Sequence, residues 1–233
     1  YGRIPESLVN DTLVLGGEVF NFGHEAQTNI SVESTIWNID GNEIISVIAT
    51  LDSLESDSIA YIEDFITNFS PLAIGNYNLD IEVSSDGDNV FGENFANNSY
   101  DRNFAVTDNL YSLDGIGVYD DELLNVSVLG TNSFNDTEDG LIIMNYYEIR
   151  QETKVSALEV AIANDDIYSS AGAEILPFLI TLEAKDSDQF YDRIVEGDVI
   201  TVEDWHLSEE KMLLPFEETV LEPGIYFAGV ELF

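Results

Sequence analysis

Apolar and polar residues alternate with a period of two along most of this chain, and this pattern limits its fold more than any other feature. The alternating segments are rich in Val, Ile, Thr, Tyr and Phe, which is typical of β-strands with one buried face. No segment keeps the i, i+3, i+4 apolar spacing of an amphipathic helix over three turns. Turn residues separate the strands at intervals of about 8–12 residues, as in a β-sandwich. The pattern therefore predicts an all-β fold.

The alternation lapses at 107–111 and then restarts, so we expect two tandem β-sandwiches, over residues 1–108 and 109–233. The dipeptide Asp40-Gly41 predicts a hairpin turn. One helical turn is predicted over 208–214, with Ser208 as its N-cap. The predicted strands cover 13–22, 29–38, 43–51, 58–69, 77–83 and 102–106 in the first half, and 123–129, 140–149, 155–163, 178–183, 198–202 and 225–232 in the second.

Charge limits the partners. The chain has 46 Asp and Glu against 7 Lys and Arg, a formal net charge of −39, yet 45% of its residues are hydrophobic, which is too many for a disordered acidic tail. Because self-repulsion opposes a compact state, we expect the fold to need salt or bound cations. Nucleic acids and anionic membrane surfaces are disfavoured partners, since their phosphates would be repelled. No apolar run reaches the roughly 20 residues that cross a bilayer, so membrane insertion is not expected.

The residues available for catalysis are few. The absence of cysteine excludes disulfides, zinc–thiolate sites and cysteine nucleophiles. The only histidines are His24 and His206, without a Gly-x-Ser-x-Gly motif, and each is expected at the solvent edge or in packing. Carboxylates are abundant, but nothing in the sequence places two of them at a glycosidase spacing. We therefore expect a protein that is not an enzyme.

Three stretches of the first half resemble a known family when they are taken in order. They are residues 18–32, with an Asn-x-Gly corner at Asn21–Gly23, residues 71–79, with a Pro-Gly-Tyr approach to a strand, and residues 86–99, an acidic Glu-Asn-x-x-Asn-Asn loop. These stretches resemble the bacterial cell-adhesion-related domain, CARDB. The resemblance covers residues 1–108 and implies an immunoglobulin-like sandwich. Phe22 departs from the pattern, because a polar residue is more familiar in that corner.

The second half looks like the jelly-roll-like domains that follow such modules in large surface proteins of the Bacteroidetes. The stretches that carry this likeness are 153–160, 196–202 and 221–230. The resemblance implies export by the type IX secretion route, an extracellular location on the bacterial cell surface, and a C-terminal signal outside this chain. The start at Tyr1, without an initiating Met, is expected for a piece of a longer protein.

Two acidic loops are candidate calcium sites, because this hard cation takes six to eight oxygen ligands. In the first loop, Asp86 and Asp88 alternate around Gly87, and Glu93 and Asn94 follow. The second candidate contains Asp136 and Asp139 and imitates the start of an EF-hand loop, but Tyr146 stands where the bidentate acid is needed. The alternative interpretation of each loop is a solvated turn without a metal, since Asp, Asn and Gly favour turns by themselves.

Modification and ligand stacking give further candidates. If the Bacteroidetes resemblance holds, O-glycosylation of Asp-Ser/Thr-aliphatic motifs is expected at Thr12, Ser53 and Ser58. Trp205, flanked by Asp204 and His206, is the exposed aromatic residue expected to stack on a sugar, whereas Trp37 is expected in the core.

The function that these features favour is that of a non-catalytic module of an exported surface protein, acting in adhesion or as a stalk or filament segment. Its expected partners are other domains or copies of the same protein, and glycans. Two alternatives stay open. One is a carbohydrate-binding module, with the jelly-roll half as the lectin. The other is an accessory region of a secreted hydrolase or peptidase.

Overall fold

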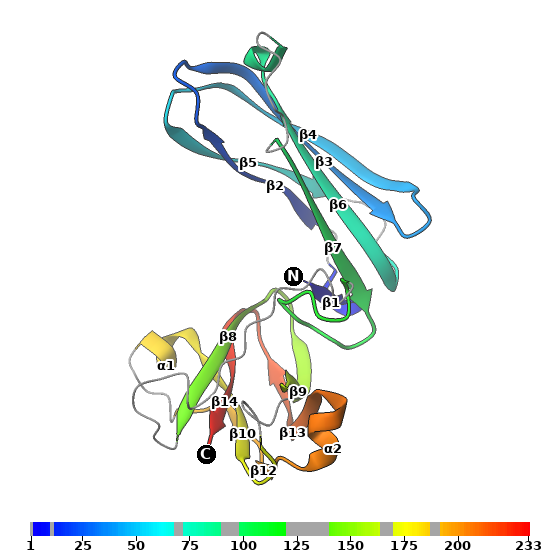
Figure 1. Ribbon diagram of the computed structural model, residues 1–233, viewed down its shortest axis with the longest axis vertical. Coiled ribbons are helices and arrows are strands. Elements are labelled where there is room, and N and C mark those ends of the chain that lie inside the picture. The colour runs from blue at the N-terminus through cyan, green and yellow to red at the C-terminus, as the bar shows by residue number, and fades with distance from the viewer. Residues whose placement is uncertain are drawn as a thin grey trace. The chain divides into compact units, whose positions relative to one another are not determined.

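The computed structural model describes residues 2–9, 12–67, 72–89, 98–119, 140–163, 170–186 and 192–233. Within these ranges the chain is mostly β, with a few short helices, and it divides into two compact units, Tyr1–Leu124 and Asn125–Phe233. Each unit combines a larger sheet with a two-stranded sheet (Figure 1). The predicted all-β class with two β-sandwiches is confirmed.

The first unit has a five-stranded sheet of order β1-β7-β6-β3-β4, and β2 pairs with β5 in a second sheet. On β3, the alternate residues Ile30, Val32 and Ile36 are buried, as the period of two requires. Ile30 and Val32 pack with Ile62 of β5, so this core lies between the two sheets. The elements are β1 (Arg3–Pro5), the 3-10 turn η1 (Glu6–Leu8), β2 (Thr12–Asn21), β3 (Gln27–Asn38), β4 (Glu43–Leu54), β5 (Ser58–Thr67), β6 (Gly75–Ser84), the 3-10 turn η2 (Asp86–Asn89) and β7 (Ser99–Thr107).

The hairpin predicted at Asp40-Gly41 joins β3 to β4. Gly41 has a φ of 77°, a conformation that favours glycine. The Asn38 side chain closes the turn, because its Oδ1 accepts hydrogen bonds from the backbone N–H groups of Asp40 (3.1 Å) and Asn42 (2.9 Å). An Asn side chain that bonds the backbone two residues ahead is a common turn device.

The Asn-x-Gly corner fixes the passage from β2 to β3. Asn21 is buried, and its Nδ2 donates to the carbonyls of Glu25 (2.9 Å), Leu54 (3.0 Å) and Glu55 (3.1 Å), while its Oδ1 accepts from the Gly23 N–H (2.9 Å). One side chain thus satisfies backbone groups of its own corner and of the β4–β5 turn. Phe22, the residue that departs from the family pattern, is 74% exposed and takes no part in these bonds.

The second unit pairs a sheet of order β11-β10-β14-β8 with the two-stranded sheet β13-β9, and β12 also pairs with β10. Met212 and Leu214 of β13 are buried against Ile175 of β10 and Val230 of β14, so this core also lies between sheets. The elements are β8 (Leu141–Ile149), β9 (Thr153–Ala161), β10 (Glu174–Thr181), α1 (Leu182–Asp186), β11 (Val195–Glu196), β12 (Ile200–Thr201), α2 (Asp204–Glu209), β13 (Lys211–Leu221) and β14 (Gly224–Leu232).

A proline explains why one edge of β10 is paired by two short strands. β11 pairs at Phe178 and Leu179, and β12 pairs at Glu174 and Ile175. Between these pairs lies Pro177, which has no N–H to donate to a ladder but accepts from the Gly197 N–H at 2.9 Å. The strand predicted over 198–202 is therefore reduced to the two residues of β12.

Several predicted boundaries are corrected by the structure. The helical turn predicted over 208–214 is wrong: α2 lies earlier, Ser208 lies inside it, and Glu210, with a φ of 57°, ends it. Lys211 then begins β13, where Met212 and Leu214 alternate with exposed Leu213. The short strand β1 was not predicted, and the strand predicted over 178–183 begins earlier and turns into α1 at Leu182. The strand predicted over 123–129 lies outside the described residues.

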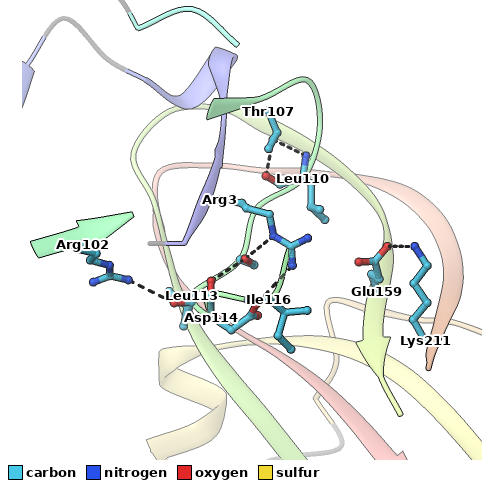
Figure 2. A network of polar contacts seen from close by, with 10 residues as sticks. Arg3, Arg102, Thr107, Leu110, Leu113, Asp114, Ile116, Glu159 and Lys211 are labelled. Atoms are coloured by element: carbon cyan, nitrogen blue, oxygen red, sulfur yellow. Dashed lines mark hydrogen bonds and ion pairs between the residues drawn. The ribbon is translucent and has the colours of Figure 1, made fainter. Parts of the chain in front are cut away.

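The stretch after β7 is bonded to the first unit. Ser112 forms an isolated antiparallel bridge with Arg3, and its Oγ accepts from the Arg3 Nε at 3.0 Å. Asp114 lies 3.5 Å from an Arg3 Nη2, and the Arg102 Nη2 donates to the Leu113 carbonyl at 3.5 Å. Figure 2 shows these contacts around Arg3. Among the described residues, no helix is long and apolar enough to cross a membrane.

Candidate functional site

A cavity of about 350 Å³ opens on the five-stranded sheet of the first unit. Trp37, Asn78 and Asn103 line it, and they are direct register partners across β3, β6 and β7. Direct partners on neighbouring strands project from the same face of a sheet. The adjacent residue Ile36 points to the opposite face, into the core between the sheets. Trp37, which was expected in the core, is instead half-buried on the wall of this cavity.

The segment after β7 supplies another wall. Val118 lines the cavity, and the hydroxyl of the next residue, Tyr119, accepts a hydrogen bond from the Asn103 backbone N–H at 2.6 Å. This bond satisfies the Asn103 N–H. The three-residue strand β1 pairs with β7 only at residues 105–107 and so does not extend to Asn103. The segment 115–119 is turned upon itself by bonds from the N–H groups of Val118 and Tyr119 to the Gly115 carbonyl, at 3.0 and 3.1 Å.

Some polar groups of the residues that line this cavity have hydrogen-bond partners within the protein, and one does not. The Trp37 indole N–H is buried and has no hydrogen-bond acceptor among the described residues. A buried donor without a partner costs about 1–3 kcal/mol, so such a group marks a place where an acceptor from outside would be favourable. The Asn78 Nδ2 donates to the Asn103 Oδ1 at 2.9 Å.

The electrostatics of the cavity are acidic. Asp80 lines it and is half-buried, and none of the described lining residues is basic. Tyr77 is also among the lining residues, but its side chain lies on the opposite face of the sheet, where it stacks on Phe104 and packs with the core around Ile36. Burial raises the pKa of its hydroxyl, which donates to the Ala73 carbonyl at 2.8 Å. The site can bind hydroxyl and amide groups, and it disfavours anions.

Sequence reasoning missed this cavity for a physical reason. Residues 37, 78, 103 and 118 are far apart in the chain, and only the pairing of β3 with β6 and of β6 with β7 brings them together. One signal was present: Trp37 has the opposite parity to Ile36 and Val32 on the same strand, which predicts the opposite face.

The calcium candidates remain predictions. Asp86 and Asp88 lie in η2, and both carboxylates already have protein partners. Asp86 accepts from the Thr28 hydroxyl at 3.2 Å and from the Asn29 side chain, and Asp88 accepts from the Ser85 N–H at 2.6 Å. Glu93 and Asn94 lie outside the described residues, as do Asp136 and Asp139 of the second candidate. Among the residues that are described, no group of three or more acidic or histidine side chains is placed to hold a metal ion.

Trp205 is 52% exposed, as expected, and lies on α2. Its Nε1 donates to the Glu203 carboxylate at 2.5 Å, and its ring contacts that of His206, with centroids 3.6 Å apart. His206 is buried and its Nδ1 accepts from the Glu203 backbone N–H at 2.9 Å, as part of the helix cap. His206 is therefore a packing residue, and His24 is exposed.

The three predicted glycosylation residues differ in accessibility. Ser53 is exposed near the end of β4. Ser58 is half-buried at the start of β5, and its hydroxyl is 3.4 Å from the Ser56 carbonyl. Thr12 begins β2, and its side chain lies outside the described part of the structure. Of the two hydroxyl groups that the structure describes, that of Ser53 belongs to the more exposed residue.

Comparisons with known proteins identify no family for this chain: no family model matches it, and neither does any curated protein. One similar solved structure, determined by NMR, is a domain of a provisionally named cell surface protein from Methanosarcina acetivorans. It is 20% identical over 48% of this chain and 89% of that domain, with a TM-score of 0.32. The exo-chitosanase of Amycolatopsis orientalis is 11% identical, and the match covers 94% of this chain but 23% of that enzyme, with a TM-score of 0.25. TM-scores this low do not establish a common fold.

Proposed function

We propose that this chain is a non-catalytic region of an exported bacterial surface protein, in which two β-sandwich units act in adhesion or as a stalk segment. The supporting motifs are those that resemble CARDB and the surface proteins of the Bacteroidetes. The surface charge agrees with this role, because a formal net charge of −39 suits an extracellular, hydrated surface and repels nucleic acids and anionic lipids. His206, one of the two histidines, has a structural role in the helix cap, where its Nδ1 accepts from the Glu203 backbone N–H.

One observation carries the mechanical part of the proposal: the first strand of unit 1 pairs in parallel with its last. Arg3, Ile4 and Pro5 lie opposite Ala105, Val106 and Thr107, and the Ala105 N–H donates to the Gly2 carbonyl at 2.9 Å. Tension along the chain pulls β1 from its start and β7 from its end. Parallel strands pulled from opposite ends share the load over all their hydrogen bonds, whereas a hairpin pulled from one end opens one bond at a time.

The segment 110–119 is the first part of the unit to bear this load. Ser112 lies antiparallel to Arg3, so tension opens this bridge from one end, and the parallel pair β1–β7 resists afterwards. A stalk exposed to shear would benefit from such a clamp.

Single-molecule force spectroscopy of the full chain tests the proposal. We expect two unfolding events, one for each unit, and a lower unfolding force for the first unit in a variant that lacks residues 1–5. The event of the second unit in the same molecules is the internal control and should be unchanged. An equal force for the first unit with and without β1 would refute the clamp.

The carbohydrate-binding alternative was expected in the second half of the chain, but the observation that favours carbohydrate binding, the polar cavity beside Trp37, lies in the first unit. The two roles are compatible, because an adhesive stalk needs both mechanical resistance and a ligand.

A further inference from the structure

We propose that the cavity beside Trp37 binds a neutral saccharide, so that glycan recognition belongs to the first unit and not to Trp205 in the second. The inference deepens the adhesive role proposed above and rests on it only for the surface location. The cavity volume of about 350 Å³ lies at the lower end of the range of roughly 300–1,000 Å³ that small-molecule sites occupy. It suits one sugar ring of a longer glycan.

The Asn78–Asn103 pair presents the pattern that a hydroxyl group needs. Their hydrogen bond uses one donor of Asn78 and the acceptor of Asn103. The Asn78 Oδ1 and the Asn103 Nδ2 remain, an acceptor and a donor from neighbouring residues. Reversing both amides would also leave one acceptor and one donor, so either orientation offers a hydroxyl group the same two partners. A sugar hydroxyl both donates and accepts, and therefore complements this pair.

The Trp37 indole supplies the second element. Trp37 lines the same cavity as the asparagine pair, and its buried indole N–H has no acceptor among the described residues. A sugar oxygen is an acceptor for this group, and the apolar part of the indole suits the C–H groups of a sugar ring.

Charge selects among saccharides. The half-buried Asp80 carboxylate accepts hydrogen bonds from hydroxyl groups but repels carboxylate and sulfate groups, and no basic residue among the described lining residues offsets it. Neutral sugars are therefore expected to bind, and uronic acids and sulfated sugars to be rejected.

The two tryptophans make a direct measurement possible, since the chain contains only Trp37 and Trp205. In the Trp205→Phe protein, tryptophan emission reports on Trp37 alone. We expect this emission to shift on titration with glucose, galactose, mannose or N-acetylglucosamine, or with their oligosaccharides. Glucuronic acid at neutral pH should give no shift. The Trp37→Phe protein, in which Trp205 alone emits, should not respond.

Calorimetry on the full chain measures the contribution of each group. Trp37→Phe keeps an aromatic ring but loses the N–H, and it should weaken binding about two- to tenfold. Asn78→Ala should weaken it about tenfold or more, because the hydroxyl partner is lost and Asn103 loses its orientation. Ser84→Ala is the matched control, because Ser84 is exposed at the far end of β6, where its hydroxyl contacts that of Ser31 at 2.7 Å. It should leave binding unchanged.

Three results would overturn the inference. They are no binding of any neutral saccharide at millimolar concentration, equal affinity in the wild-type, Trp37→Phe and Asn78→Ala proteins, or loss of binding in Trp205→Phe. Thermal melting of each variant shows whether the fold is intact, and Trp37→Phe serves if Asn78→Ala does not fold. Failure of the saccharide proposal and failure of the mechanical proposal can be told apart. The mechanical proposal is tested by the unfolding force of the variant that lacks β1, and the saccharide proposal by ligand binding.

Discussion

Each of the seven basic residues contacts an acidic, polar or aromatic group in the structure. Arg193 is the most buried of those in ion pairs, with a side chain only 6% exposed. Its guanidinium contacts Glu196 at 2.6 Å, bonds to Glu231, and lies 4.3 Å from the centre of the Phe178 ring. The other basic residues and their partners are Arg3 with Ser112 and Asp114, Arg102 with the Leu113 carbonyl, Arg150 with Glu148, Lys154 with Glu218, Lys185 over Phe227, and Lys211 with Glu159.

We predict that Arg193→Met destabilises the second unit strongly. The Glu231 side chain is only 11% exposed, so the substitution leaves a carboxylate nearly buried without its cation. Breaking a buried pair in this way costs about 3–5 kcal/mol in the free energy of unfolding. Urea denaturation of the full chain measures the effect, and replacement of both residues by Met should recover much of the loss.

Lys154→Met is the matched control. Lys154 forms a hydrogen bond to Glu218 at 2.7 Å, and this bond raises the pKa of Lys154, but the pair lies on the surface. Exposed pairs contribute little to stability because solvent screens them. The prediction for Arg193 is contradicted if the two substitutions shift the urea midpoint equally.

A second residue-scale prediction concerns calcium. If Asp86 and Asp88 are ligands, calcium should raise the melting temperature of the wild-type protein, and Asp86→Asn with Asp88→Asn should abolish that rise. Magnesium is the control cation. No heat of calcium binding to the unmodified protein would exclude the site.

The bounds of individual helices and strands depend on hydrogen-bonding partners and chain reversals, which the alternation of apolar and polar residues does not reveal. The segment 208–214 contains good helix formers, yet the αL residue Glu210 ends α2 and the following residues alternate into a buried strand. Likewise β1 is too short to show a period, and it exists because β7 and Ser112 supply its partners.

The boundary of the first unit gives the element-scale prediction. The sequence predicts a boundary after residue 108, whereas Ser112 and Tyr119 contact the first unit. We expect a fragment of residues 1–119 to be more stable to urea than a fragment of residues 1–108. The difference should be about 2–4 kcal/mol, from several hydrogen bonds of roughly 1 kcal/mol each. Equal stability of the two fragments would place the boundary at 108, and limited proteolysis of the full chain provides an independent check.

For the molecule as a whole, the excess of negative charge is the main electrostatic influence on the stability of the fold. Because the basic groups are already engaged, most of the 46 acidic side chains have no cationic partner, and their mutual repulsion opposes the folded state.

We predict that melting temperature rises steeply as sodium chloride is increased from about 10 mM to about 500 mM, since the Debye length falls from roughly 30 Å to a few Å over that range. Potassium chloride at equal ionic strength is the control and should act equally, because screening does not depend on the identity of a monovalent ion. Identical melting temperatures at both salt concentrations would argue against an electrostatically strained surface.

Properties that depend on near neighbours in the chain could be predicted from the amino-acid sequence. Alternation along residues 29–38 predicted β3, Asp40-Gly41 predicted its turn, and the composition predicted the acidic surface. The strands were predictable because a pleated strand with one buried face imposes its period locally. Boundaries such as that of β12 were not, because they depend on a residue of another strand, Pro177.

The candidate site and the buried ion pair depend on contacts between residues that are distant in the sequence. Trp37, Asn78 and Asn103 meet because the registers of β3, β6 and β7 align them, and Arg193 meets Glu231 across 38 residues of chain. The composition contains many asparagines and acidic residues that could form such groups by number alone. Strand pairing selects which of them become neighbours, because register is set by the burial of whole faces and not by any one side chain.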